Sequence, residues 1–170
     1  MIDIVIVAEK SYFIDVGKVV KFLNTIKSRI LNRDMIRLGL VVFSKWAAPF
    51  MDLTTDFYRV DKIYESIPVV KGRPEPALGL YEAGDMLIDF DEGLGNEKVL
   101  VLISSLTVKP RIPLRLAIIF LESLHVNLYL LTTSRRKPKW LSELPENIVK
   151  NVFILRDHNM DKIVRNIFSY

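Results

Sequence analysis

Short runs of β-branched and other apolar residues alternate with longer amphipathic segments along the whole chain of 170 residues. The short runs suit buried strands, and apolar residues at helical spacing between them suit helices that cover a sheet. Parallel neighbouring strands need a crossover connection, so the alternation predicts βαβ units around a mostly parallel sheet. We therefore expect an α/β domain of three layers, Rossmann-like, with helices on both faces of the sheet.

The expected strands and helices can be placed along almost the whole chain. The strands at residues 37–44 and 49–53 are joined by only four residues, which allows an antiparallel hairpin and no crossover. Pro49 has no amide hydrogen to donate, so the second of these strands is expected at an edge of the sheet. Further strands are predicted at residues 2–8, 99–103, 126–131 and 152–155, and helices at 16–30, 55–67, 77–90, 113–124, 138–144 and 160–168.

Several helices are preceded by side chains that can accept hydrogen bonds from free backbone N–H groups. Asp15 is the expected N-cap of the first helix, Thr54 or Thr55 of the second, and Asp157 or Asn159 of the last. No internal repeat, linker or low-complexity segment divides the sequence. We expect a single domain over residues 1–170.

Composition limits the classes of protein that this chain can belong to. The absence of cysteine excludes disulfides, thiolate metal sites and cysteine nucleophiles, and it fits a reducing compartment. No secretory signal is visible, and the apolar stretch 114–124 is too short to span a bilayer. We expect a soluble, cytoplasmic protein. The lack of Gln and Cys, with many Ile, Val, Lys and Arg residues, is typical of thermophilic sources.

The sequence indicates no catalytic residues. His125 and His158 are the only histidines, and neither adjoins an obvious nucleophile or orienting acid. The chain has no Gly-x-Gly-x-x-Gly after its first strand and no Gly-x-x-x-x-Gly-Lys-Ser/Thr loop, so the usual phosphate cradles are missing. Convergent carboxylates for two catalytic metals are not evident either. We predict a protein that is not an enzyme.

Residues 3–14 read Asp-Ile-Val-Ile-Val-Ala-Glu-Lys-Ser-Tyr-Phe-Ile. This opening resembles the start of a von Willebrand factor type A domain, in which an apolar strand runs into Asp-x-Ser-x-Ser. The later landmarks keep the order of that family: Val41-Val-Phe-Ser44, Gly72-Arg-Pro74, the strands near 99–105 and 126–133, and Asn151-Val-Phe-Ile. The resemblance implies about six strands in the order 3-2-1-4-5-6, with the third strand as the antiparallel edge.

The family gathers oxygen side chains from three loops around a divalent ion, its metal-ion-dependent adhesion site. The five positions are here Glu9, Ser11, Phe13, Pro74 and Ser105. Phe13 and Pro74 have no side-chain oxygen, and Ser105 is neutral where the family has Asp, so the anionic attraction for a dication is reduced. The resemblance therefore implies a degenerate site with no metal and no cofactor. A weak Mg²⁺ or Mn²⁺ site on Glu9, Ser11 and Ser105 remains the alternative.

Without a metal, other contacts must satisfy these positions. We expect a neighbouring Lys or Arg to pair with Glu9, Ser11 to cap the backbone that enters the first helix, and Phe13 to fill the space of the ion. Glu75 is the one nearby carboxylate that could complete a metal site instead.

A domain without catalytic residues acts through what it binds. The resemblance implies an intracellular protein-protein interaction module, a scaffold that serves as a subunit or adaptor of a larger complex. Aromatic and Arg side chains make good anchors in interfaces, and several fall on the loops that the family uses for ligands. The predicted partner-binding rim consists of Lys10, Tyr12, Phe13, Trp46, Arg73, Glu75 and Leu106, near Pro74. The alternative is that Tyr12, Phe13 and Trp46 pack beneath those loops.

The basic segment Arg135, Arg136, Lys137 and Lys139 leaves a second function open. A run of like charges is most simply a solvated loop. It is also compatible with a nucleic-acid contact, with Trp140 stacking on a base.

Overall fold

The computed structural model describes residues 1–30, 35–91, 93, 95–149 and 151–168. Six strands form one sheet in the order β3-β2-β1-β4-β5-β6, as the resemblance implied. β2 and β3 form the antiparallel hairpin at one edge, and all other neighbouring strands are parallel. The strands are β1 (Ile2–Glu9), β2 (Ile36–Phe43), β3 (Ala47–Thr54), β4 (Glu97–Ser104), β5 (Val126–Thr132) and β6 (Val152–Ile154).

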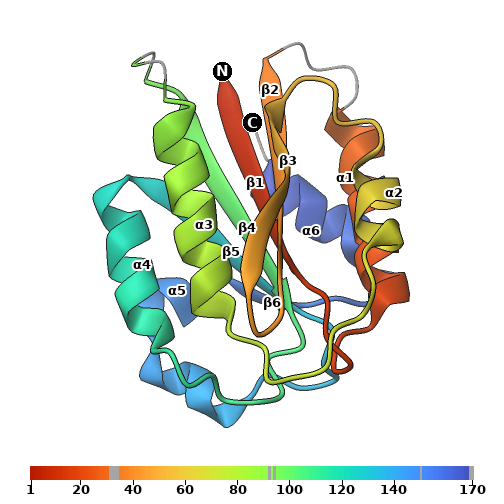
Figure 1. Cartoon of the computed structure of the whole chain (residues 1–170), viewed down its shortest axis with the longest axis vertical. Coiled ribbons are helices and arrows are strands. Elements are labelled where there is room, and N and C mark those ends of the chain that lie inside the picture. The colour runs from red at the N-terminus through yellow and green to blue at the C-terminus, as the bar shows by residue number, and fades with distance from the viewer. Residues whose placement is uncertain (31–34, 92, 94, 150, 169–170) are drawn as a thin grey trace.

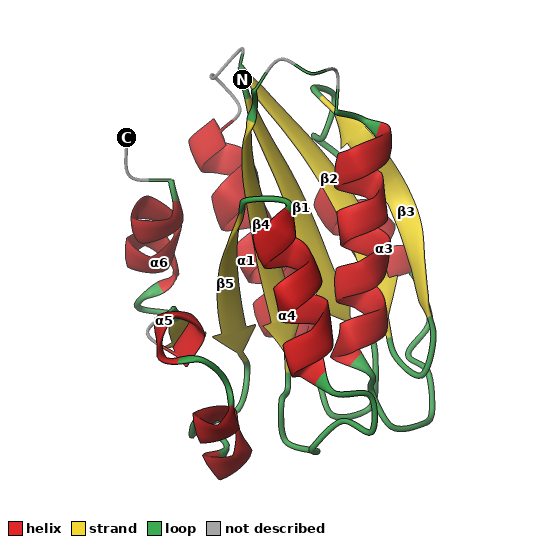
Figure 2. Cartoon of the chain, turned by 90° about the vertical axis from the view of Figure 1, so that its left-hand side faces the viewer, coloured by secondary structure: helices red, strands yellow, loops and turns green. Residues whose placement is uncertain are grey.

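Helices cover both faces of the sheet, which gives the three layers expected from the sequence (Figure 1). α1 (Val16–Ile30), α2 (Val60–Ser66) and α6 (Met160–Ile167) pack on one face. α3 (Pro76–Asp89) and α4 (Leu114–Ser123) lie side by side on the other face (Figure 2). A short 3₁₀ helix, η1 (Lys139–Glu143), and α5 (Glu146–Val149) connect β5 to β6. No helix among the described residues is long and apolar enough to cross a membrane.

β1 lies at the centre of the sheet, between β2 and β4, and its middle is completely buried. Its side chains alternate between the two apolar cores: Ile4, Ile6 and Ala8 contact one, and Val5 and Val7 the other. A strand covered on both faces requires the continuous apolar run seen in the sequence. The carboxyl end of β1 is therefore held firmly in place, and with it the residues that follow.

One expected N-cap is wrong, and another, Asn159, is right in position but forms no capping bond. α2 begins at Val60, later than predicted, and neither Thr54 nor Thr55 caps it; the Thr54 hydroxyl accepts the N–H of Asp56 in a local turn. Asn159 precedes α6, but its amide oxygen accepts the N–H of Arg156. In both cases the short polar side chain bonds to its own loop, which competes with capping. The four-residue helix α5 was not predicted.

Gly79 in α3 permits a close approach of this helix to the sheet. An added Cβ would lie 2.6 Å from Cγ1 of Val7 and 3.1 Å from Cδ1 of Phe43, both of which are buried. We predict that Gly79→Ala lowers the free energy of unfolding by about 1–3 kcal/mol, because overpacking outweighs the better helix propensity of Ala.

Gly17→Ala is the matched control in urea denaturation, since its methyl group would meet only Oδ1 of Asp15, at 3.5 Å. It should keep or raise stability by up to about 1 kcal/mol. Equal stability of the two variants would show that α3 can move away from the sheet at little cost.

Candidate functional site

Glu9 ends β1 with a carboxylate that is fully buried. Both of its oxygens accept hydrogen bonds from serines. The hydroxyls of Ser11 and Ser105 donate to Oε1, the Ser105 contact at 3.0 Å. The Ser104 hydroxyl and the Ser105 backbone N–H donate to Oε2, at 2.5 and 2.8 Å. Charge-assisted bonds from four donor groups replace the water that burial removes.

The serine hydroxyls are oriented by the backbone around them. The Ser11 oxygen accepts the N–H of Phe13 at 3.1 Å, and the Ser104 oxygen accepts the N–H of Leu106 at 3.2 Å. A hydroxyl has one proton to donate, and here that proton points to Glu9. We expected Ser11 to cap the backbone that enters the first helix. Its oxygen does accept a backbone N–H, that of Phe13, in the loop before α1. Ser104 was missed, although it stands next to Ser105 at the end of an apolar strand.

Among the residues that the structure describes, no Lys or Arg pairs with Glu9, so the expected ion pair is wrong. The nearest candidate in sequence, Lys10, is buried on the other side of the sheet, where its Nζ donates to the Tyr64 carbonyl at 2.9 Å and lies 4.2 Å from the centre of the Tyr64 ring. Burial lowers the pKa of Lys10, and the charge of Glu65 acts in the opposite direction. Lys10 therefore does not belong to the exposed rim predicted from the sequence.

Tyr64 of α2 connects Lys10 to the end of β1. Its hydroxyl donates to the backbone carbonyl of Glu9 at 2.6 Å. Burial, followed by the charge of Glu9, raises the pKa of Tyr64 well above its ordinary value, so the phenol stays protonated and keeps donating. From the sequence, Tyr64 was expected to lie in a short helix, and no contact with Glu9 or Lys10 was predicted for it.

Glu75 is also buried, and its carboxylate accepts hydrogen bonds from the backbone. Its carboxylate accepts the N–H groups of Arg111, at 3.0 Å, and Ile112, at 3.1 Å. These bonds join the loop before α3 to the loop before α4. Glu75 is therefore neither an exposed rim residue nor directed to a metal.

The side chains at the five positions do not fit a divalent cation as they lie. Phe13 and Pro74 supply no side-chain oxygen, and the Phe13 ring is 50% exposed; that it fills the space of an ion stays a prediction. Each carboxylate oxygen of Glu9, the one anionic side chain among the five positions, already accepts two hydrogen bonds, which a cation would have to displace. Among the residues that the structure describes, no group of three or more His, Cys, Asp or Glu side chains could hold a metal ion.

The loops around Glu9 are bonded to one another. Val70, in the loop between α2 and α3, donates its N–H to the carbonyl of Lys10 at 2.9 Å. The Glu75 bonds tie that same loop to the one between β4 and α4. Glu9 then ties the β4–α4 loop back to β1. The three loops form a closed set of contacts at the carboxyl ends of the strands.

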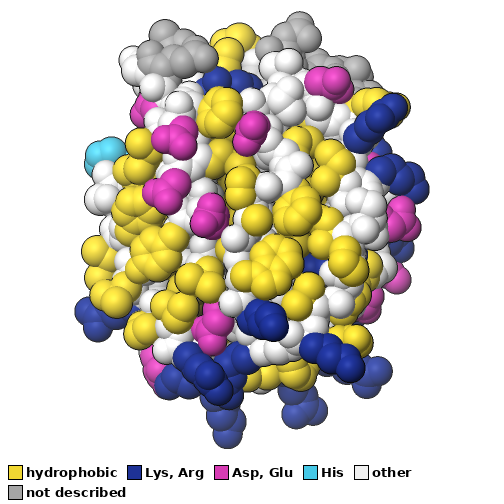
Figure 3. Space-filling model, in the orientation of Figure 1, with side chains coloured by type: hydrophobic (Ala, Val, Ile, Leu, Met, Phe, Trp, Pro, Cys, Tyr) yellow, Lys and Arg dark blue, Asp and Glu magenta, His cyan; other side chains and the backbone are white. Residues whose placement is uncertain are grey.

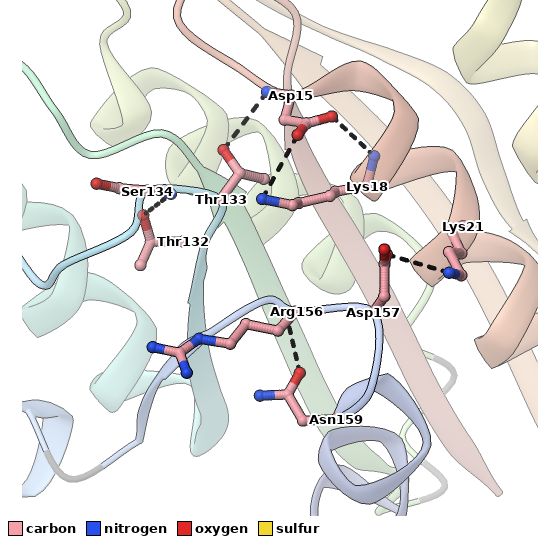
Figure 4. Close-up of polar contacts among 9 residues, drawn as sticks. All are labelled: Asp15, Lys18, Lys21, Thr132, Thr133, Ser134, Arg156, Asp157 and Asn159. Atoms are coloured by element: carbon pink, nitrogen blue, oxygen red, sulfur yellow. Dashed lines mark hydrogen bonds and ion pairs between the residues drawn. The ribbon is translucent and has the colours of Figure 1, made fainter.

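The segment after β5 joins this set from the other side (Figure 4). The Thr133 hydroxyl accepts the N–H of Asp15 at 3.5 Å, and Asp15 in turn accepts the N–H of Lys18 at 3.1 Å. The expected N-cap of α1 is thereby confirmed. The Thr132 hydroxyl, which accepts the N–H of Ser134, donates to the carbonyl of Ser105 at 2.9 Å.

A groove of about 490 Å³ opens above these contacts. It brings together three of the predicted rim residues, Tyr12, Phe13 and Arg73. Trp46 does not line it and packs near Phe50 instead, with ring centres 6.3 Å apart. Leu106 is buried beneath the loops, in a left-handed backbone conformation with φ of 51°. The groove is lined by Tyr12, Phe13, Lys71, Gly72, Arg73 and Val108, of which Lys71, Gly72 and Val108 were not predicted.

The basic segment lies on the same end of the molecule. Arg135, Arg136, Lys137 and Lys139 are exposed. Trp140 is half-buried, and its indole N–H donates to the carbonyl of Leu106 at 3.2 Å. The ring is thus fixed against the β4–α4 loop, which limits the base stacking considered for it.

Several solved structures have the same fold as this chain. No protein-family model matches the sequence, and no curated protein matches it. An aerotolerance-related membrane protein from Bacteroides fragilis NCTC 9343 superposes with a TM-score of 0.76 at 14% identity, over 99% of this chain and 98% of that one. The VWA domain of SpRpn10 gives a TM-score of 0.71 at 11% identity, over 98% and 95%.

A third similar structure is proximal thread matrix protein 1 from the mussel byssus, with a zinc-occupied MIDAS motif, the metal-ion-dependent adhesion site. Its TM-score is 0.72 at 17% identity, over 96% of this chain and 45% of that one. The chain has the fold of a von Willebrand factor type A domain.

Replacing the Glu9 carboxylate tests the hydrogen-bonded cluster. In Glu9→Gln the amide presents N–H groups to hydroxyls that already donate, so at least one buried donor loses its acceptor. We predict a loss of about 2–3 kcal/mol in the free energy of unfolding, measured by urea denaturation. The control Glu143→Gln removes an ion pair with Lys109 in which both side chains are 60% exposed, and should cost less than about 1 kcal/mol. Equal losses would argue against the cluster.

Proposed function

We propose that this domain is a non-enzymatic protein-protein interaction module, a subunit or adaptor of an intracellular complex, that binds its partner without a metal ion. The observation that carries the proposal is the pair of exposed aromatic side chains at the groove, Tyr12 and Phe13. Domains of this fold are generally protein-interaction modules, which supports the same conclusion.

Exposure of these two rings distinguishes them from core residues. Tyr12 is 63% and Phe13 50% exposed, and they are consecutive in a loop held by the Ser11 and Val70 contacts. Large aromatic side chains on a fixed loop supply contact area at low entropic cost, as the anchors of interfaces do. The alternative expectation, that both rings pack beneath the loops, does not agree with this exposure.

The metal-free part of the proposal rests on the Glu9 cluster. A cation could bind Glu9 only by displacing hydrogen-bond donors from a carboxylate whose oxygens each accept two already, and the displaced buried donors would then need new acceptors. Binding through Tyr12 and Phe13 requires no such rearrangement. The cluster in this view is a structural support beneath the groove.

The serine hydroxyls of the Glu9 cluster also support the proposal that the domain is not an enzyme. Activation of a serine needs a base that accepts its proton, and a buried carboxylate that already accepts bonds from three other donors is a poor one. His158 is exposed, and His125 is exposed beyond the end of α4, before β5. In the described part of the chain neither histidine bonds to Ser104 or Ser105.

Removal of both rings should abolish partner binding and leave the fold intact. We predict that Tyr12→Ala/Phe13→Ala captures at least about tenfold less partner from an extract of the native cell than the unmodified protein. Its thermal midpoint should change by no more than about 2 °C, as for other surface substitutions. Capture is quantified by mass spectrometry of the bound proteins.

The matched control is Leu116→Ala/Ile119→Ala on α4, where the side chains are 57% and 50% exposed but lie outside the groove. This variant should bind like the unmodified protein. If the control variant loses as much partner as the Tyr12 and Phe13 variant, the partner binds at α4 or binds non-specifically. A fall of many degrees in the midpoint of the Tyr12 and Phe13 variant would instead assign the rings to the core.

Metal addition gives an independent test. Calorimetric titration with Mg²⁺ or Mn²⁺ should show no saturable heat, and the thermal midpoint should not rise, because a ligand that binds only the folded state would stabilise it. Partner capture should be the same with and without a chelator. Saturable binding of either ion, or loss of capture in the chelator, would contradict the metal-free proposal.

A further inference from the structure

Basic side chains gather at the end of the molecule where the parallel strands finish (Figure 3). Lys71 and Arg73 stand at the groove, and Lys109, Arg111 and Arg115 follow β4 on the neighbouring loop and the first turn of α4. The basic segment 135–139 extends the same surface. All of these side chains are exposed.

The acidic side chains at this end do little to balance them. Glu9 and Glu75 are buried and bonded to N–H and O–H groups, as described above. The exposed acids Asp15, Glu143 and Asp157 each pair with a lysine. Within the described part of the chain Lys71, Arg73, Arg111 and Arg115 form no ion pair. The surface is therefore strongly positive. The acidic residues Glu82, Asp85 and Asp89 of α3 lie away from the carboxyl ends of the strands.

A second hollow of about 450 Å³ lies beside the groove. Val108 lines the groove and Lys109 lines the second hollow, so the β4–α4 loop separates the two. Its lining combines the apolar side chains of Leu114, Trp140 and Leu144 with Arg111, Arg115 and the ion pair between Lys109 and Glu143. Both hollows are thus mainly apolar with cations in their lining, and the β4–α4 loop contributes to each.

We infer that the partner presents an extended acidic segment of polypeptide, with apolar side chains that enter the two hollows and carboxylates that meet Lys71, Arg73 and Arg111. This inference rests on the proposed function and adds the chemistry of the partner. Complementary charge sets partner choice and association rate, and the buried apolar side chains slow dissociation.

The lining favours polypeptide over nucleic acid. Apolar groups dominate both hollows, and Trp140 is held by its bond to Leu106 instead of standing free for a base. Single-stranded nucleic acid needs accessible rings along a basic track. Here Tyr12 and Phe13 share one groove with Val108, and the basic segment carries no exposed ring.

The experiment is a selection from a random linear peptide library displayed on phage, with the full chain as the target. Enriched peptides should be net negative and contain aromatic or aliphatic residues at two separated positions. A synthetic copy of the most enriched peptide should bind at least about tenfold more weakly to Lys71→Glu/Arg73→Glu, and binding should weaken with added salt. Lys162→Glu/Arg165→Glu, on exposed positions of α6, makes the same change in net charge and should alter the dissociation constant less than about twofold.

Different failures have different meanings. Uncharged enriched peptides that require Tyr12 and Phe13 but tolerate Lys71→Glu/Arg73→Glu would overturn the acidic-segment inference and leave the proposed function standing. No enrichment would also overturn it, while partner capture tests the proposed function separately. A single-stranded oligothymidylate that binds more tightly than the best peptide, and loses affinity in Arg135→Glu/Arg136→Glu, would replace the polypeptide by a nucleic acid.

Discussion

The carboxyl-end surface of this domain depends on the burial of one carboxylate with hydroxyl partners in place of a cation. Moving a charge from water into a protein interior costs several kcal/mol unless hydrogen bonds replace its hydration. Glu9 meets this condition with the hydroxyls of Ser11, Ser104 and Ser105 and one backbone N–H. Each donor comes from a segment that must therefore lie within bonding distance of β1. The charge thus fixes the loops around it.

This arrangement separates support from recognition. The polar atoms of the Glu9 cluster are satisfied by one another, so they offer little to a ligand that arrives from solvent. What remains available is a set of exposed rings and cations on the loops, above all Tyr12, Phe13, Lys71 and Arg73. An oxygen-lined metal site and an aromatic, basic groove are alternative uses of the same end of a parallel sheet, where successive loops converge.

The sheet was predictable because its signals are repetitive, whereas the site depends on single contacts. The apolar runs placed β1, β4 and β5 within a residue or two, and the short hairpin connection placed β3 at the edge. Neighbouring residues at a strand end point to opposite faces, so Glu9 and Lys10 could not pair. Ser104 lies beside Glu9 because Ala8 is paired with Ile103 on β4, a register that the sequence alone does not show. The position of Tyr64 over Lys10 depends on how α2 packs, which no local pattern indicates.

Cross-linking of the loops also bears on the cost of binding. Association is weakened when a surface must become ordered as it binds, because conformational freedom is lost. Here the bonds from Val70 to Lys10 and from Glu75 to the β4–α4 loop already hold the walls of the groove in the absence of a partner. A flexible acidic segment would lose its own freedom but would find the rings and cations in place. The entropy lost on binding would then fall mainly on the segment, and the buried Glu9 cluster is what makes that division possible.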